Sequence, residues 1–482
     1  MAGKLEHFEL NLSRLSEAAD MIDKLIIRDF GKIDSEHVEQ TLQKIPFGRW
    51  RHFGTENQKS LLSELGALDK MELTRSVLDL IVVSVLLDAG AGDDWKFNDN
   101  GKILMRSEGL AVATLRMFQG GMWSSVGKLQ VDSIGLRAIQ ESDLIHWFQV
   151  RKDNPLLGVK GRLDLLHRLG RVLESQPVYF PKDVNGFARP GSLVDHLLTR
   201  QCGHAQIHVN VLWDVVMKGF GGVWPESRTK LDGVSLGDVW PCAALGLLVP
   251  FHKLSQWLTY SLMERITHFL DINFLEADKM TGLAEYRNGG LFIDLGILTP
   301  KKLSSLEPSL PSVFNQLVQL MSNTTAQLKS VNPALSEGTM EGMMEELEKS
   351  PFHKDLLDAL KAKSLEQRAD ETPGAATDEW IEYGKDDLCP DSGVLSQKES
   401  LILGSSFPPE SQVIIEWRAL TVALMDRLIA LMRGRLKVSP ESFSFPKFFV
   451  AGSWKAGREL AKQLRPATGG PPISIDSDGT LF

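Results

Sequence analysis

The sequence predicts a mainly α-helical fold, a compact multi-helix globular protein with few short strands. Apolar residues recur at three- and four-residue steps through much of the chain, whereas the strict alternation of a half-buried strand is scarce. No internal repeat of fixed period is visible, which argues against a solenoid. These patterns predict helices over residues 10–25, 71–87, 109–118, 134–147, 193–216, 254–270 and 413–432.

Composition narrows the functional class. At 482 residues and 43% hydrophobic, the chain can bury a large core, and its net charge of -9 argues against a nucleic-acid binder. The longest apolar runs, 77–87 and 243–251, are too short to span a bilayer, and the amino terminus lacks the apolar segment of a secretory signal. Cys202, Cys242 and Cys389 have neither metal nor redox spacing. We therefore expect a cytoplasmic protein that binds neither nucleic acid nor membrane.

The helical pattern is interrupted once. Residues 1–330 carry the pattern of a helical core, and residues 412–482 carry further helices and a tail that we expect to complete the same core. Residues 331–411 are acidic and rich in Ser, Glu, Pro and Gly, which is typical of a largely disordered linker or insertion.

The segment 285–294 has the composition of a site. Glu285, Tyr286, Arg287 and Asp294 surround a Gly-Gly pair that permits close approach of backbone to backbone or ligand. An apolar run follows directly, so the charges are expected to lie against a core, where they need partners. The segment lines a functional site or forms a structural ion pair at a turn.

Charged residues also lie at the ends of two predicted helices. Asp88 follows the apolar helix 71–87, where the helix dipole disfavours a carboxylate, so it needs a compensating donor or a functional role. Arg106 and Glu108 open the helix 109–118, and with Arg116 they can grip a sugar or phosphate. The alternative for Arg106 and Glu108 is ordinary helix capping, with Ser107 as N-cap.

Polar residues also mark two other helices. His252 and Gln256 lie one turn apart after Pro250, so they share a face that can line a pocket or contain a hydrogen-bonded core histidine. Glu416 and Arg427 lie on one face of the helix 413–432 and give it a narrow charged edge, either in a site or in an interhelical salt bridge, and Arg418 belongs to the same segment.

The basic and aromatic segment 49–53 adds planar donors. Arg49 and Arg51 offer bidentate geometry suited to phosphate or carboxylate, although a surface loop has the same composition. His204 and His208 have the spacing of zinc ligands but lack the glutamate of a zincin. Phosphate-loop, dinucleotide, nucleophile-elbow and paired-cysteine motifs are not found in the sequence, so we expect no metal and no cofactor.

Taken together, these motifs resemble the uracil catabolism protein 4 family of fungi and bacteria. The resemblance runs from about residue 10 to residue 482, broken by the acidic insertion, and rests on segments 49–53, 86–92, 106–111, 154–156, 248–262, 285–298, 416–424 and 469–480. Glu285-Tyr286-Arg287 also resembles the Asp-Tyr-Arg motif of queuosine salvage glycosidases, which are helical N-ribosyl hydrolases.

The resemblance implies a place in a pyrimidine breakdown route that opens the ring of a uracil ribonucleotide and takes apart a ribosylurea. We expect hydrolysis of the N-ribosyl bond of ribosylurea or its phosphate, giving urea and ribose or its phosphate. Asp294, Glu285 and Asp88 are the catalytic candidates. The substrate-binding candidates are Arg49, Arg51, Arg106, Glu108, His252, Gln256, Tyr286, Arg287, Glu416 and Arg418.

Two alternatives remain open at this level. The chain can be a non-catalytic partner of an upstream uracil catabolic enzyme, with the acidic insertion as its interaction segment. An amidase acting on the ureido carbon is a third possibility, but the sequence offers no obvious Cys or Ser nucleophile or metal site for it.

Overall fold

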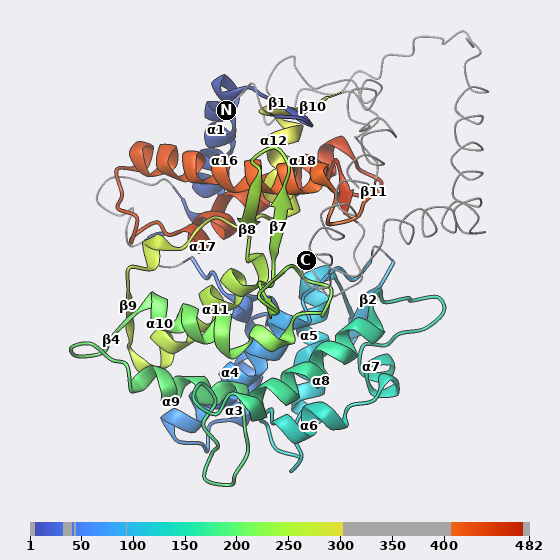
Figure 1. The fold of residues 1–482 in the computed structure, drawn as a ribbon, viewed down its shortest axis with the longest axis vertical. Helices are drawn as coiled ribbons and strands as arrows, with labels where there is room; N and C mark the ends of the chain where they lie inside the picture. Colours follow the sequence, from blue (N-terminus) through green and yellow to red (C-terminus); the bar gives the residue numbers. More distant parts are fainter. Residues whose placement is uncertain (1–4, 32–40, 43–44, 93, 302–405, 476–482) are drawn as a thin grey trace, which may run out of the picture. The chain divides into compact units, whose positions relative to one another are not determined.

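The computed structural model describes residues 5–31, 41–42, 45–92, 94–301 and 406–475 (Figure 1). The helical class is confirmed, because helices dominate these residues and strands occur there only in two-stranded sheets. The described residues before and after the gap at 302–405 belong to one compact unit. The predicted linker, 331–411, lies almost entirely outside the described residues. Cys202 and Cys242, both within the described ranges, are free thiols.

The helices begin and end as follows, in chain order: α1 (Leu15–Phe30), α3 (Thr55–Glu64), α4 (Lys70–Leu86), α5 (Arg106–Gln119), α6 (Ser133–Ala138), α7 (Glu141–Trp147), α8 (Val159–Ser175), α9 (Leu193–Leu198), α10 (Val209–Asp214), α11 (Lys253–Leu270), α12 (Tyr286–Asp294), α16 (Gln412–Leu436), α17 (Phe445–Phe448) and α18 (Trp454–Leu464). Short helical turns that matter below are η3 (Arg49–Phe53) and η4 (Pro190–Ser192). In the described part of the chain, no helix is both long and apolar enough to cross a membrane.

The strands are short and tie distant segments together. Antiparallel pairs join β1 (Phe8–Leu10) to β10 (Leu298–Pro300), β2 (Lys96–Asp99) to β3 (Lys102–Met105), β5 (Lys230–Leu231) to β6 (Val234–Ser235), and β7 (Val239–Cys242) to β8 (Leu247–Pro250). Parallel pairs join β4 (Gln206–His208) to β9 (Asn273–Leu275) and β11 (Ser406–Phe407) to β12 (Ser474–Ile475).

Two predicted helices are divided in the structure. The segment 193–216 contains α9, strand β4 and α10, because Gly203 and Ala205 adopt positive φ angles of 68° and 55° that a helix cannot contain. The segment 134–147 contains α6 and α7. It breaks at Ile139, whose ψ of 136° is extended, and α7 then starts with a capping box between Gln140 and Asp143.

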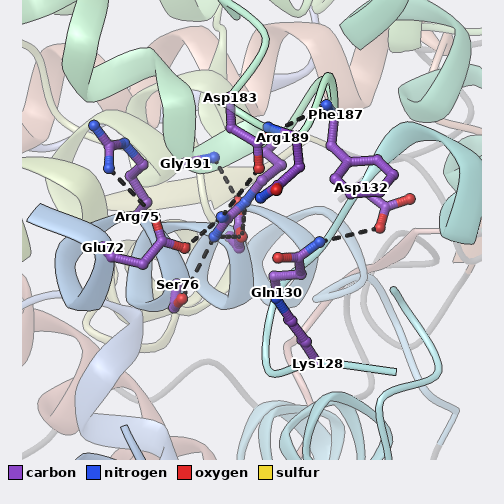
Figure 2. Close-up of polar contacts among 12 residues, drawn as sticks. Glu72, Arg75, Ser76, Lys128, Gln130, Asp132, Asp183, Phe187, Arg189 and Gly191 are labelled. Carbon is purple, nitrogen blue, oxygen red and sulfur yellow. Dashed lines mark hydrogen bonds and ion pairs between the residues drawn. The ribbon is translucent and has the colours of Figure 1, made fainter. Parts of the chain in front are cut away.

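Helix α4 lies in the centre of the core and carries a buried charge. Asp79, which is fully buried, accepts hydrogen bonds from Arg189 at 2.7 and 3.0 Å and from the backbone N–H groups of Gly191 and Val131. Figure 2 shows the Arg189 guanidinium reaching between Glu72 and Ser76 on α4, with Gly191 beside it. This network fixes η4 and the segment before α6 to α4.

Helix α12 packs between α16 and α18, in the upper half of Figure 1. The Gly-Gly pair permits this close packing, as the sequence predicts. A Cβ atom on Gly289 would lie 2.7 Å from Thr421 Oγ1, and one on Gly290 would lie 3.0 Å from Pro472 Cδ. On the facing helix, a Cβ atom on Gly457 would lie 2.3 Å from the carbonyl oxygen of Arg287. The amino terminus of α12 is thereby held against α18.

Candidate functional site

A cluster of charged side chains gathers where several helix ends meet. The amino termini of α5, α11 and α12 contribute to it, as do the short segment after α4, the turn η3 and one face of α18. We call this set the charged cluster. Its members interact electrostatically with one another, and they are Arg49, Arg51, Asp88, Glu108, Lys253, Glu285, Arg287 and Arg458.

Arg49 is the donor that Asp88 was expected to need. Its fully buried guanidinium donates from Nη1 to Asp88 Oδ2 at 2.7 Å and from Nε to Ser84 Oγ at 2.9 Å. Burial lowers the pKa of Arg49, whereas Asp88 and Glu108 act to raise it. The third nitrogen, Nη2, is buried and has no hydrogen-bond acceptor among the described residues. The pair therefore leaves one strong donor unused.

Glu285 caps helix α12 with one carboxylate oxygen. Its Oε2 accepts from the backbone N–H groups of Arg287 at 2.8 Å and Asn288 at 3.4 Å, and the side chain is 7% exposed. Asn288 is itself held by Ser453, whose Oγ donates to Asn288 Oδ1 at 2.9 Å. Because the cap fixes Oε2, the carboxylate is held in one orientation. Its other oxygen makes no hydrogen bond within the described part of the chain.

Lys253 interacts electrostatically with two of the three carboxylates of the cluster, Glu285 and Asp88. It opens helix α11, where its backbone N–H donates to Asp238 Oδ2 at 3.0 Å. Burial lowers the pKa of the Lys253 ammonium, while Glu285 and Asp88 favour its charged form. Sequence reasoning missed Lys253, although it directly follows His252 in a segment that was singled out.

The guanidinium groups of Arg51, Arg287 and Arg458 form the other part of the cluster. Burial lowers the pKa of Arg51 to about 10 and also lowers that of Arg458, and Arg287 adds repulsion to both. Burial acts against the charge of Arg287 as well, but nearby Tyr286 and the cluster carboxylates outweigh it and raise its pKa. Glu108 lies 3.9 Å from Arg458 and is the carboxylate that all three guanidinium groups share.

Aromatic rings support these guanidinium groups. Arg51 lies 5.8 Å from the ring centre of Trp454, and Arg287 lies 5.4 Å from that of Tyr286. Such contacts stabilise a partly desolvated cation while leaving its N–H edges available. Arg51 Nε is buried and has no acceptor in the described ranges.

His52 is buried beside these cations and stays neutral. Burial, followed by the charges of Arg51 and Arg49, lowers its pKa well below the ordinary value of 6.5. The unfolded chain takes up a proton near pH 6.5 and the folded protein does not, so stability must fall as pH is lowered below that value.

We therefore predict that lowering the pH from 7 to 5 destabilises the native protein more than it destabilises His52→Gln, as measured by urea unfolding. Below the ordinary pKa of histidine, the slope of the free energy of unfolding against pH should be steeper in the native protein by about 1.4 kcal/mol per pH unit. Equal pH slopes for the two proteins would contradict a neutral buried His52.

Asp294 lies in an ion pair at the far end of α12. Arg465 donates to its two oxygens at 2.9 and 2.6 Å, and the Asp294 side chain is 4% exposed. Burial raises the pKa of Asp294, and Arg465 acts against this shift. The pair lines a small pocket open to solvent, whose walls also contain Tyr286, Arg287 and Arg458. The pocket is therefore continuous with the guanidinium side of the charged cluster.

Several candidates are engaged elsewhere. Glu416 accepts from His7 Nδ1 at 2.9 Å and from the backbone of residues 6 and 7, which fastens β1 to α16. Gln256 bonds to Thr281 and to the carbonyl of Phe251. Both side chains form hydrogen bonds within the fold in this structure.

Arg418 forms a buried bidentate pair with Asp238, at 2.9 and 2.7 Å, and lies 4.2 Å from the ring centre of Phe251. This pair joins α16 to the segment before β7. His252 lies at the start of α11 with a φ of 47°, and burial lowers its pKa. Arg106 donates to the Thr468 carbonyl at 3.2 Å, close to the tail.

The structure thus brings together part of the expected site. Arg49, Arg51, Asp88, Glu108, Glu285 and Arg287 meet in the charged cluster, and Tyr286 borders it. Lys253 and Arg458 are additional members. Arg458 lies on an amphipathic helix with no motif around it, so no signal in the sequence pointed to it. Among the described residues, no three His, Cys, Asp or Glu side chains gather closely enough to hold a metal ion.

Comparison with known proteins agrees with the motifs. The family model described as "Protein of unknown function (DUF1688)" matches residues 1–329 and 371–482. Uracil catabolism protein 4 of Lachancea kluyveri is 33% identical over 504 residues, covering 100% of this chain and 93% of its own length. Protein urg3 of Schizosaccharomyces pombe is 34% identical over 487 residues, covering 99% and 92%. The chain therefore belongs to the DUF1688 family, to which the resemblance with uracil catabolism protein 4 had pointed.

Proposed function

We propose that the protein acts in uracil catabolism as an N-ribosyl hydrolase, which splits ribosylurea or its phosphate into urea and ribose or ribose phosphate. The name of the Lachancea kluyveri relative supports the pathway. The observation that carries the reaction is the meeting of Glu285, Lys253 and Asp88 at helix ends, with an excess of guanidinium groups beside them.

The reaction needs a carboxylate at the sugar. Breaking the bond between C1 of ribose and the urea nitrogen builds positive charge on the ring, and a fixed carboxylate stabilises that charge. Glu285 fits this role because its cap holds one oxygen and leaves the other available. Asp294 is less suited, since Arg465 engages both of its oxygens.

The leaving urea nitrogen needs a proton. Lys253 fits as the donor because burial makes its ammonium more acidic than an ordinary lysine, while Glu285 and Asp88 keep it charged. Water then forms a bond to C1 of ribose, and its proton passes to the Glu285 carboxylate and from there back to Lys253. Asp88, which is paired with Arg49, is the second carboxylate, and it stabilises the charged form of Lys253.

The helical class also fits the resemblance of Glu285-Tyr286-Arg287 to the motif of queuosine salvage glycosidases. Those enzymes hydrolyse N-ribosyl bonds. This resemblance supports hydrolysis of an N-ribosyl bond here. It suggests no role for residues other than Glu285, Tyr286 and Arg287.

The test is incubation of the purified protein with synthetic ribosylurea and with its 5′-phosphate, with urea measured as product. We expect urea release from at least one of them, and loss of that release in Lys253→Met. A matched control is Lys279→Met, which removes an exposed lysine paired with Glu276. A protein that is folded but releases no urea from either compound would favour the alternative of a non-catalytic partner of an upstream enzyme.

A further inference from the structure

We propose that Arg51, Arg287 and Arg458 form a subsite for a phosphate monoester dianion, so that the hydrolase takes the phosphorylated riboside as its substrate. The inference rests on the proposed function and specifies the substrate of the same site. The phosphate group of the sugar would bind among the three guanidinium groups, while the N-ribosyl bond faces Glu285 and Lys253.

The charge balance of the cluster favours an anion. Its eight members carry five cations and three carboxylates, and the interaction of Glu264 with Arg51 reduces the local excess to one positive charge, since Asp238 and Arg418 near Lys253 cancel each other, in a chain whose net charge is -9. The repulsion among Arg51, Arg287 and Arg458 shows where this excess lies. Like charges held together without enough counter-charge reduce stability, and a bound dianion relieves that repulsion.

An unused donor in the subsite suits an acceptor-rich ligand. Arg51 Nε is buried and has no hydrogen-bond acceptor within the described ranges. A buried donor without an acceptor costs about 1–3 kcal/mol, and a bound acceptor relieves that cost. Guanidinium groups suit phosphate because their paired N–H groups match its oxygens.

The helix termini around the cluster also carry partial positive charge. Helices α5, α11 and α12 all begin there, and the positive end of a helix dipole favours a bound anion. Beside Arg287 and Arg458 lies the small, solvent-open pocket that Asp294 and Arg465 also line.

This assignment differs from the expectation drawn from the sequence, which placed the phosphate at Arg287, Arg49 and Arg106. Arg49 is committed to Asp88 and Ser84, and Arg106 donates to Thr468 near the tail. Arg287 keeps its place, and Arg51 and Arg458 join it.

The test is calorimetric titration of the full-length protein with ribose 5-phosphate, ribose and inorganic phosphate at equal ionic strength. Ribose 5-phosphate should bind at least about tenfold more tightly than ribose, and inorganic phosphate should compete with it. Arg458→Gln and Arg51→Gln should each weaken the binding of ribose 5-phosphate by about tenfold or more, and leave ribose nearly unchanged. Arg458 is the safer variant for folding, because its side chain is 46% exposed.

Arg435→Gln is the matched control, because Arg435 pairs with Asp20 and Asp23 on another surface. Equal affinities for ribose and ribose 5-phosphate would overturn the subsite, and so would tight binding that neither arginine variant weakens. The urea assay separates the two proposals. Urea release from unphosphorylated ribosylurea alone would remove the subsite and keep the hydrolase, whereas phosphate binding without urea release would keep the subsite and remove the hydrolase.

Discussion

Replacing Glu285 by glutamine should lower the turnover of ribosylurea or its phosphate, whichever is the substrate, by about a hundredfold or more, because the charge that stabilises the ribosyl cation is lost. The side-chain amide oxygen of glutamine can still accept from the backbone N–H groups of Arg287 and Asn288, so helix α12 keeps its cap. The Michaelis constant should change by only a few-fold, since the missing interaction acts mainly in the transition state. Steady-state kinetics of urea release measure both quantities.

The control for Glu285→Gln is Glu459→Gln. It removes a carboxylate on α18 that pairs with Arg28 on α1 at 2.7 Å. The control should keep its full turnover and nearly all of its stability, as is usual for exposed ion pairs. If the Glu285 variant is folded and fully active, the chemistry lies elsewhere and Asp88 becomes the next candidate. If it unfolds, Glu285 serves the fold as a cap and nothing more.

Asp79→Ala should give the largest loss of stability, about 3–5 kcal/mol, because it removes the only fully buried counter-charge among the described partners of Arg189 and leaves the partly exposed Glu72 and the more distant Asp183. Arg189 is 1% exposed and Asp79 fully buried, so water cannot replace the missing carboxylate. The backbone N–H groups of Gly191 and Val131 also lose their acceptor. Urea unfolding followed by circular dichroism gives the difference in free energy.

Asp195→Ala is the matched comparison for Asp79→Ala. Asp195 pairs with Arg75 at 2.6 Å, but these side chains are 31% and 24% exposed, so the loss should stay below about 1 kcal/mol. Equal losses for the two variants would contradict the view that burial makes the Asp79 pair essential to the core.

Local sequence could predict elements, but not which distant residues meet. The apolar run of α4, the Gly-Gly contact of α12 and the scarcity of strands all follow from residue patterns within one segment. The division of 193–216 does not follow from them, because the strand β4 exists only through its pairing with β9, far along the chain. Periodicity reports one segment at a time and cannot show such a partner.

The site shows the same limit. The sequence predicted that Asp88 needs a compensating donor or a functional role, and separately that Arg49 suits a phosphate or carboxylate, but only the fold joins these two residues. Within segment 285–294, the sequence offered two carboxylates with equal claim. The distant Arg465 distinguishes them, because it engages Asp294 and leaves Glu285 to the cluster. A side chain such as Arg458, which becomes functional only through tertiary packing, leaves no local pattern.

The bond that is broken is the central claim, and one measurement addresses it directly. Ribosylurea and its 5′-phosphate, each labelled with ¹³C at the ureido carbon, can be followed by carbon NMR during incubation with the native protein and with Glu285→Gln. The account predicts that the label appears as urea, at a rate that the substitution strongly reduces. Label appearing as carbonate, with ammonia released, would show attack on the ureido carbon and would contradict N-ribosyl hydrolysis.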